Sequence, residues 1–265
     1  MKHTRLGVCV LFAFVSFAMF VGCPAEGPSP GELRIFDGIE FVWIPAGTFT
    51  MGSPLDEVGR NLDETQHEVK ISHGFWLGKY EVTQAQWTAV MGSNPSLFES
   101  PDKPVDSVSW EDARYFITAL NVGKATIGGP YRLPTESEWE YAYRARTTTR
   151  FYWGEDSAET DIVNFAWYNF SSSGQPHEAG ERLPNEWGLH DLAGNVHEWC
   201  QDSYDISYPV GPVTDPQGPT IGDFRVLRGG SWSNGAGLAR AACRRSESRD
   251  TMGQTYGFRL ARTAD

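Results

Sequence analysis

Few residues in this chain have the types and spacing that nucleophilic or redox chemistry needs. Of its four cysteines, Cys9 and Cys23 lie near the N-terminus, and only Cys200 and Cys243 lie in the body of the chain. The sequence contains no G-x-S-x-G nucleophile elbow, no phosphate-binding P-loop and no G-x-G-x-x-G dinucleotide motif. A secreted disulfide scaffold would carry more cysteines, so Cys200 and Cys243 are expected to be buried free thiols, with a disulfide between them as the alternative.

Two other groups of ionisable residues have plainer explanations than catalysis. Asp156, Glu159 and Asp161 are expected to form a solvated acidic turn and not a glycosidase carboxylate pair. His190 and His197 could bind a transition metal, but packing or hydrogen bonding is the expected role of both imidazoles.

Composition predicts a loop-rich globular protein. The 265 residues include 28 Gly, 16 Pro and 13% aromatic residues, which favours turns pinned by buried rings over a helical bundle. The net charge of −12 disfavours nucleic acid as a partner, because such binding depends on neutralising phosphates. From Arg225 onward eight arginines face three acidic residues, so a basic C-terminal segment adjoins an acidic body.

The N-terminus has the layout of a secretory signal, with Lys2 and Arg5 before an uncharged apolar run at 6–21. A small residue followed by Cys23 resembles a bacterial lipobox, so 1–22 is predicted to be a signal peptide and Cys23 the lipidated N-terminus. Ordinary cleavage with an incidental Cys23 is the alternative. The lipid would anchor a flexible tether, 23–32, to the membrane of the bacterial cell envelope and display the protein on the outer surface.

The body reads as one domain over 33–265, because no linker divides it. Thr83, Ser109 and Thr135 each stand three residues before an acidic or amide side chain, a capping-box pattern that predicts three short helices. Short apolar runs predict strands at 41–44, 48–51, 69–71, 75–77, 225–227 and 258–260. Between 152 and 219 no periodicity predicts a helix or a strand.

Seven ordered sequence blocks resemble the formylglycine-generating enzyme, or sulfatase-modifying factor, domain family. They are IPAGTFTMGS, KYEVTQAQW, PVDSVSWEDA, YRLPTESEWEYAYRA, WGLHDLAGNVHEW, VLRGGSW and GFRLAR, and they span 44–262. The resemblance implies an α+β, C-type-lectin-like fold, a single domain with low regular secondary structure.

The resemblance implies a copper site that this chain cannot complete. The family enzymes oxidise a sulfatase cysteine to formylglycine and bind copper through two cysteines soon after the GGS[FW] motif. Asn234 and Ala239 stand at those positions here, and Cys243 is the only thiol nearby. Because Cu(I) favours thiolate ligands, we expect no copper, no oxidase chemistry and no catalytic residues.

The resemblance also implies a structural calcium ion. In the loop DLAGNVHE the carboxylates of Asp191 and Glu198 and the backbone carbonyls of Gly194 and Val196 would be its oxygen ligands. The alternative is that Asp191 caps a turn and Glu198 pairs with an arginine. A second family site would use residues 164–165, for which no acidic partner is identifiable in the sequence.

The segment 233–256 is the predicted binding region, and we call it the variable-type segment. It lies between the blocks GGSW and GFRL, mixes small, polar and charged residues, and corresponds to the floor of the family's active-site groove. Variable proteins diversified by retroelements are similar and carry a variable stretch between the same two blocks. The candidate ligand contacts are Ser233, Asn234, Gly235, Gly237, Leu238, Arg245, Ser246, Asp250, Thr251, Gln254 and Tyr256.

Other residues of the segment have structural alternatives. Arg240, Arg244 and Arg249 could contact a ligand or form salt bridges to the acidic body. Four alanines are expected to pack closely, namely Ala236, Ala239, Ala241 and Ala242. Trp232 and Phe258 would anchor the two ends of the segment while its exposed positions change.

The sequence therefore predicts a non-catalytic, lipid-anchored surface protein that binds a protein or glycan ligand through the variable-type segment. One alternative is a sulfatase-modifying-factor enzyme with altered chemistry. The other is a purely structural envelope lipoprotein.

Overall fold

Three helices begin where the sequence predicts them. The computed structural model describes residues 27–124 and 130–264, and the expected signal peptide and Cys23 lie outside these residues. Thr83, Ser109 and Thr135 each form a complete capping box, in which the hydroxyl accepts from the N3 amide and the N3 side chain accepts from the cap amide. The helices are α1 (Gln84–Met91), α2 (Trp110–Leu120) and α3 (Glu136–Arg144).

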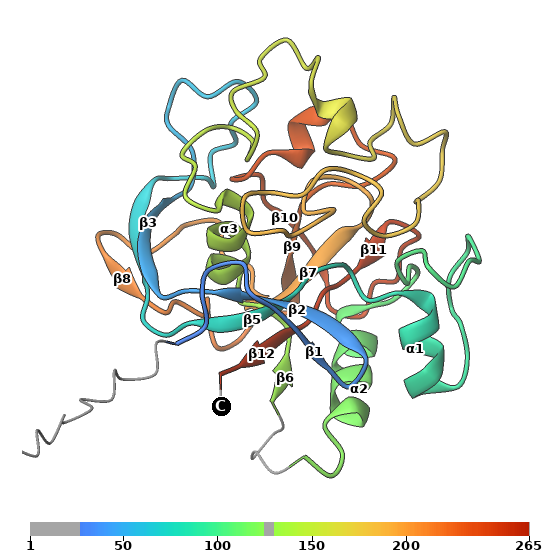
Figure 1. Cartoon of the computed structure of the whole chain (residues 1–265). Helices are drawn as coiled ribbons and strands as arrows, with labels where there is room; N and C mark the ends of the chain where they lie inside the picture. Colours follow the sequence, from blue (N-terminus) through green and yellow to red (C-terminus); the bar gives the residue numbers. More distant parts are fainter. Residues whose placement is uncertain (1–26, 125–129, 265) are drawn as a thin grey trace, which may run out of the picture.

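Short strands form three small sheets (Figure 1). The five-stranded sheet has the order β1-β2-β5-β12-β6, the four-stranded sheet β10-β9-β7-β11 and the three-stranded sheet β3-β4-β8. The strands are β1 (Leu33–Phe36), β2 (Ile39–Ile44), β3 (Gly47–Met51), β4 (His67–Ile71), β5 (Phe75–Gly78), β6 (Tyr131–Arg132), β7 (His197–Ser203), β8 (Val213–Thr214), β9 (Phe224–Arg228), β10 (Arg245–Ser248), β11 (Tyr256–Gly257) and β12 (Ala261–Thr263). With two 3₁₀ turns, η1 (Ile162–Asn164) and η2 (Ala236–Ala239), this is the predicted α+β fold of low regular content.

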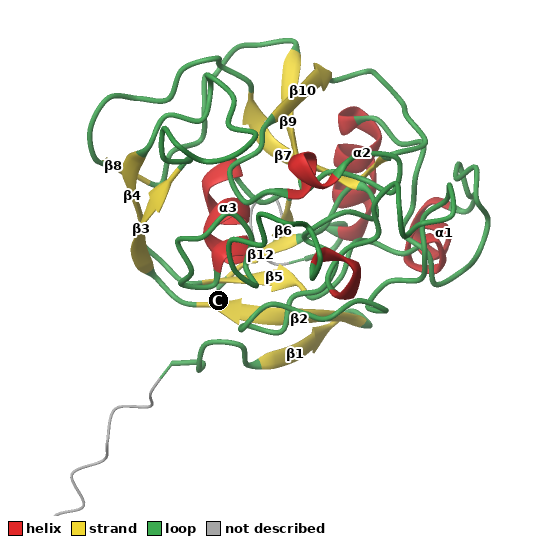
Figure 2. Ribbon diagram, turned by 90° about the horizontal axis from the view of Figure 1, so that it is seen from above, coloured by secondary structure: helices red, strands yellow, loops and turns green. Residues whose placement is uncertain are grey.

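The buried apolar side chains form two clusters, one that includes residues of α3 and one that includes residues of α2. Helix α3 contacts strands of two sheets, β3 and β4 on one side and β7 and β9 on the other (Figure 1). Helices α1 and α2 lie together at the end of the molecule opposite the β3-β4-β8 sheet (Figure 2). In the described part of the chain, no helix is long and apolar enough to cross a bilayer.

Two sequence predictions about strands are wrong. Residues 258–260 do not form a strand, because the carbonyls of Phe258 and Leu260 accept from the amides of Val82, in a loop, and Gly78, at the end of β5, and make no regular ladder. The stretch 152–219 does contain strands, including β7, which carries no alternating pattern because nearly all of its residues are buried.

Aromatic stacking orders much of the long irregular stretch. Trp153 stacks between Phe151 and Phe165 with ring centroids 4.5 and 4.7 Å away. Trp167 lies between His177, stacked at 3.6 Å, and the guanidinium of Arg182, 3.4 Å from its ring centroid. Such contacts help to offset the entropy cost of ordering a loop that has few ladder hydrogen bonds.

Candidate binding surface

The variable-type segment leaves β9 through a tight double-glycine turn. Gly229 and Gly230 have φ of +90° and +74°, a region that favours glycine. A Cβ on Gly229 would lie 2.9 Å from the Leu192 carbonyl oxygen, and one on Gly230 would lie 2.9 Å from that of Leu238. This turn therefore packs closely against Leu192 of the scaffold and against Leu238 of the segment itself. The chain later returns as β10, the edge strand beside β9.

Apolar residues hold the segment from beneath. Trp232 is buried, donates its indole N–H to the Gln254 carbonyl at 3.2 Å and meets Phe98 edge-on. Phe258 is also buried, so both expected anchors lie in the interior. The expected close packing of the four alanines is confirmed, because Ala236, Ala239, Ala241 and Ala242 are all buried.

Arg240 ties the middle of the segment to the loop that follows β3. Its buried guanidinium bonds both carboxylate oxygens of Glu64, at 2.7 and 2.8 Å, and one oxygen of Glu57 at 2.6 Å. It also donates to the carbonyls of Gly59 and Gly237, at 2.6 and 2.9 Å. Arg240 is thus a structural residue, as one of the two sequence alternatives expected.

Arg244 is a second buried arginine that joins the segment to the rest of the fold. Its guanidinium bonds both oxygens of Glu136 at 2.6 and 2.9 Å, and it donates to the carbonyls of Asp63 and Asp205. Arg249 differs, because it is exposed and lies only loosely against Glu111, at 3.6 Å. Of the three arginines, only Arg249 therefore stays accessible to a ligand.

On either side of Arg240 and Arg244, most of the predicted contacts reach the surface. Side chains or backbone are exposed at Ser233, Gly235, Arg245, Asp250 and Gln254. Partial exposure is found at Asn234, Gly237, Leu238, Ser246 and Thr251. These residues occupy two stretches, 233–238 and 245–254, on either side of the buried run 239–244.

Tyr256 does not present its ring to a ligand, contrary to the prediction. It is 8% exposed, packs edge-on against Trp199 with centroids 5.5 Å apart, and donates its hydroxyl to Glu247 at 3.1 Å. Its place in β11, paired with the buried strand β7, explains this burial. Sequence type alone suggested an interface tyrosine because pairing between distant strands is not visible locally.

The residues at the copper positions do not fit a copper ion. Asn234 accepts the hydroxyl of Ser231 at 2.7 Å, and Ala239 offers only a buried methyl group. Cys243 and Cys200 are both buried free thiols, which confirms the expected absence of a disulfide between them. Burial raises the pKa of Cys243 to about 11, so this thiol is protonated near neutral pH and is a poor metal ligand.

Both carboxylates among the expected calcium ligands, Glu198 and Asp191, have other partners. Glu198 forms a buried two-point ion pair with Arg259, both contacts 2.6 Å, and accepts the indole N–H of Trp139 at 2.8 Å. Asp191 accepts the Gly180 amide at 2.6 Å. Within 27–124 and 130–264, no group of three or more His, Cys, Asp or Glu side chains is placed to hold a metal ion. Glu198 in this arrangement is not free to bind calcium, and the arginine-pairing alternative describes it.

Each backbone carbonyl of the second expected calcium site accepts a hydrogen bond. The Asn164 carbonyl accepts the Leu183 amide at 3.0 Å, and the Phe165 carbonyl accepts the Tyr152 hydroxyl at 3.3 Å.

Glu81 organises the 191–198 loop and was not found by sequence reasoning. It is fully buried and accepts the Asn195 side-chain amide at 2.7 Å and the Val196 backbone amide at 3.1 Å. Burial and then the nearby Asp191 carboxylate raise the pKa of Glu81 well above its usual range. Its partners lie more than a hundred positions along the chain, so no local pattern could reveal them.

The remaining ionisable candidates have structural roles. Asp156 accepts the backbone amides of Thr160 and Ile162, each at 2.9 Å, and thereby closes the exposed acidic turn. His190 bonds the Arg182 carbonyl at 2.8 Å. His197 is buried, and this burial lowers its pKa to about 4, so it is neutral near pH 7.

Comparisons with known proteins agree on one family. A model of the sulfatase-modifying factor enzyme 1-like domain matches residues 30–264. The chain is 36% identical over 205 residues to formylglycine-generating enzyme of Streptomyces coelicolor, an alignment covering 72% of this chain and 62% of that protein. It is 28% identical over 234 residues to chaperone protein LppX of Paenibacillus barcinonensis, covering 71% and 80%. Its fold is similar to Treponema denticola variable protein 1, with a TM-score of 0.76, 30% identity and coverage of 88% and 99%.

Proposed function

Because the chain belongs to the sulfatase-modifying factor enzyme 1-like domain family, we propose that it is a non-catalytic member displayed on the bacterial cell surface, where it binds a protein or glycan ligand. The lipid on Cys23 would anchor it, and the stretches 233–238 and 245–254 would contact the ligand. The similarity to Treponema denticola variable protein 1 supports a scaffold of the variable-protein kind.

The proposal rests on a contrast within the variable-type segment, between the buried run 239–244 and the exposed stretches on both sides of it. Buried ion pairs of Arg240 and Arg244 fix the run 239–244, while the residues on both sides reach the solvent. A rigid support lowers the entropy cost of binding, so exposed side chains can change without loss of the fold. Arg249 and Arg245 are the exposed residues of the type that anchors many interfaces.

A substitution scan of the folded domain tests this division. We expect exposed positions such as Ser233, Gln254 and Asp250 to accept most residues, with the folded fraction unchanged. Arg240, Arg244 and Ala242 should accept almost none. Equal sensitivity at exposed and buried positions would contradict a displayed binding surface.

Catalysis is the second candidate function, favoured by the 36% identity to the Streptomyces enzyme. Asn234 and Ala239 oppose it, because neither side chain can supply the thiolate that copper-dependent oxidation requires. Incubating the purified protein with copper and a sulfatase cysteine peptide separates the two. An aldehyde on the peptide would establish catalysis and reject the proposal, whereas unchanged peptide is the expected result.

A further inference from the structure

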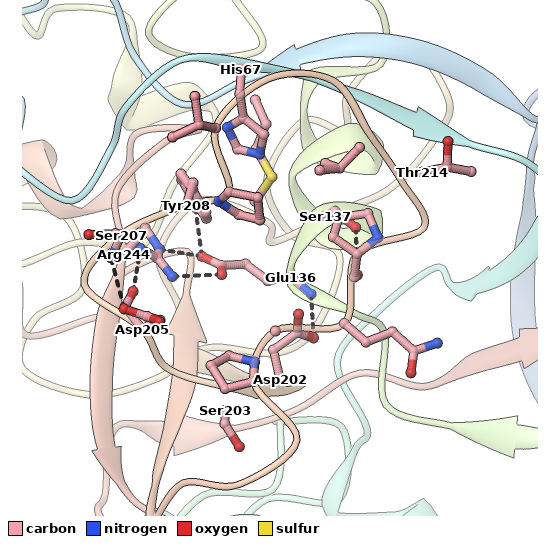
Figure 3. A pocket seen from close by; sticks show the side chains of 18 residues that line it. His67, Glu136, Ser137, Asp202, Ser203, Asp205, Ser207, Tyr208, Thr214 and Arg244 are labelled. Carbon is pink, nitrogen blue, oxygen red and sulfur yellow. Dashed lines mark hydrogen bonds and ion pairs between the residues drawn. The ribbon is translucent and has the colours of Figure 1, made fainter.

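A cavity of about 740 Å³ opens beside the N-terminus of α3, between β4 and the 202–219 stretch (Figure 3). Its size is within the range of small-molecule sites. Arg244 is its only lining residue from the variable-type segment, so the cavity does not use the exposed stretches 233–238 and 245–254.

Asp202 places a buried carboxylate without a cationic partner in the wall of this cavity. One of its oxygens, Oδ2, accepts the Glu136 backbone amide at 2.9 Å. Among the described residues, no ion pair includes Asp202. Burial, and then the adjacent Glu136, raise its pKa well above the ordinary value, so its ionised form lacks compensation. A cationic ligand would supply the missing charge.

The cavity's guanidinium is not available to an anionic ligand. Arg244 uses Nε and Nη2 on Glu136 and Nη1 on two backbone carbonyls. Glu136 also accepts from Arg228 at 3.0 Å and from the Tyr208 hydroxyl at 3.0 Å. The Glu136 carboxylate is therefore paired with the guanidinium groups of Arg228 and Arg244, whereas the Asp202 carboxylate has no cationic partner among the described residues.

His67 adds an unused acceptor to the same wall. It is 8% exposed, and its Nδ1 lies 3.1 Å from the Thr65 carbonyl oxygen, so Nδ1 carries the proton. Its Nε2 is buried and has no hydrogen-bond partner within the residues that the structure describes. Figure 3 shows the imidazole extending from the edge of the cavity toward the other lining side chains.

Apolar side chains line another part of the cavity, notably Met51, Val210 and Val213 with several prolines of the 209–219 stretch, beside polar residues such as Ser207, Thr214 and Gln217. We propose that this cavity binds a small organic ammonium ligand, whose N–H groups donate to Asp202, with the imidazole of His67 in the same wall, and whose carbon chain packs against Val210 and Val213. This inference goes beyond the proposed function, because it concerns a different ligand at a different site.

Calorimetric titration of the purified full chain tests the proposal with 1,5-diaminopentane as the probe and 1,5-pentanediol as its uncharged counterpart. The diamine should bind at least about tenfold more tightly than the diol, because charge-assisted hydrogen bonds are the stronger kind. Equal affinities, or no binding of the diamine to folded protein, would overturn the proposal. Tighter binding of Nα-acetyl-lysine amide than of the diamine would indicate a peptide lysine as the source of the ammonium group. Tighter binding of the diamine would indicate a free amine. Both results support the site.

Matched variants assign the binding to Asp202. Asp202→Asn should weaken diamine binding about tenfold or more, whereas Asp205→Asn, which changes an exposed carboxylate on the same rim, should change the affinity less than about twofold.

A second pair of variants tests the position of the ligand. Val210 is fully exposed, so its substitution leaves the core intact. Val210→Lys should weaken diamine binding and Val210→Glu should strengthen it. Unchanged affinity in Asp202→Asn, or in both Val210 variants, would overturn the proposal.

Discussion

Arg240 and Glu64 form a fully buried two-point ion pair, with Nη2–Oε1 and Nη1–Oε2 distances of 2.7 and 2.8 Å. The pair joins the middle of the variable-type segment to the loop after β3, 176 residues away along the chain. Glu57 shares the same guanidinium at 2.6 Å. A segment that otherwise has little regular structure is thereby held in one position against the scaffold.

Removing this tie should destabilise the fold strongly. Arg240→Ala leaves the carboxylates of Glu64 and Glu57 buried without a cation, and breaking a buried pair in this way typically costs about 3–5 kcal/mol. Urea unfolding followed by circular dichroism measures the loss. Arg249→Ala is the matched control, since its exposed side chain should change stability by less than about 0.5 kcal/mol. Similar stability of the two variants would show that Arg240 is not a structural residue.

The two body cysteines should be unreactive in the native protein. Burial raises the pKa of Cys243 to about 11 and that of Cys200 well above its usual range, so neither forms an accessible thiolate at pH 7.5. A chromogenic thiol reagent should modify neither residue until denaturant is added, after which both should react. Rapid modification of native Cys243 would contradict the buried arrangement.

Calcium removal should leave the protein unchanged. Arg259 already compensates the Glu198 carboxylate, so stability should not depend on a divalent cation at that position. Melting curves with excess EGTA and with excess calcium are expected to coincide, while Glu198→Gln should lower the melting temperature by weakening the ion pair. A melting temperature several degrees lower in EGTA would instead establish calcium as part of the fold.

Asp202 should make stability depend on pH in a defined direction. Its pKa is raised in the folded protein, so its favourable contribution is complete below about pH 4 and is lost as pH rises through the folded-state pKa. Between pH 5 and 8, Asp202→Asn should therefore gain stability relative to the natural chain, by at most about 1.4 kcal/mol per pH unit.

The groups facing Asp202 are Glu136, Glu138 and Arg244, and all three stay in place in this variant. Denaturant unfolding at four pH values gives the comparison, with Asp205→Asn as the control. A stability difference that does not change with pH, or that falls, would contradict the raised pKa.

The features that sequence reasoning predicted are those set by short-range hydrogen bonds. Thr83, Ser109 and Thr135 cap helices because both partners of each capping box lie within three residues. The predicted strands also include β2, β3, β4, β5 and β9, whereas the other seven strands of the described residues were not predicted. Among these seven, β7 and β10 show no alternating pattern.

Features that depend on distant residues were not predictable from local pattern. Sequence left Arg240 and Arg244 open between ligand contact and salt bridging, because their carboxylate partners lie far away along the chain. Tyr256 was misassigned for the same reason, since its burial depends on pairing of β11 with β7. The cavity beside Asp202 likewise forms only when β4, α3 and the 202–219 stretch come together.

Sequencing this locus from many isolates tests the central claim most directly. The account predicts that amino-acid changes concentrate in 233–238 and 245–254, at exposed positions such as Ser233, Arg245 and Gln254, while Arg240 and Arg244 are unchanged. A recognition surface on a fixed scaffold would be contradicted by changes scattered evenly over the chain. It would also be contradicted by changes that occur at the buried arginines as often as at the exposed positions.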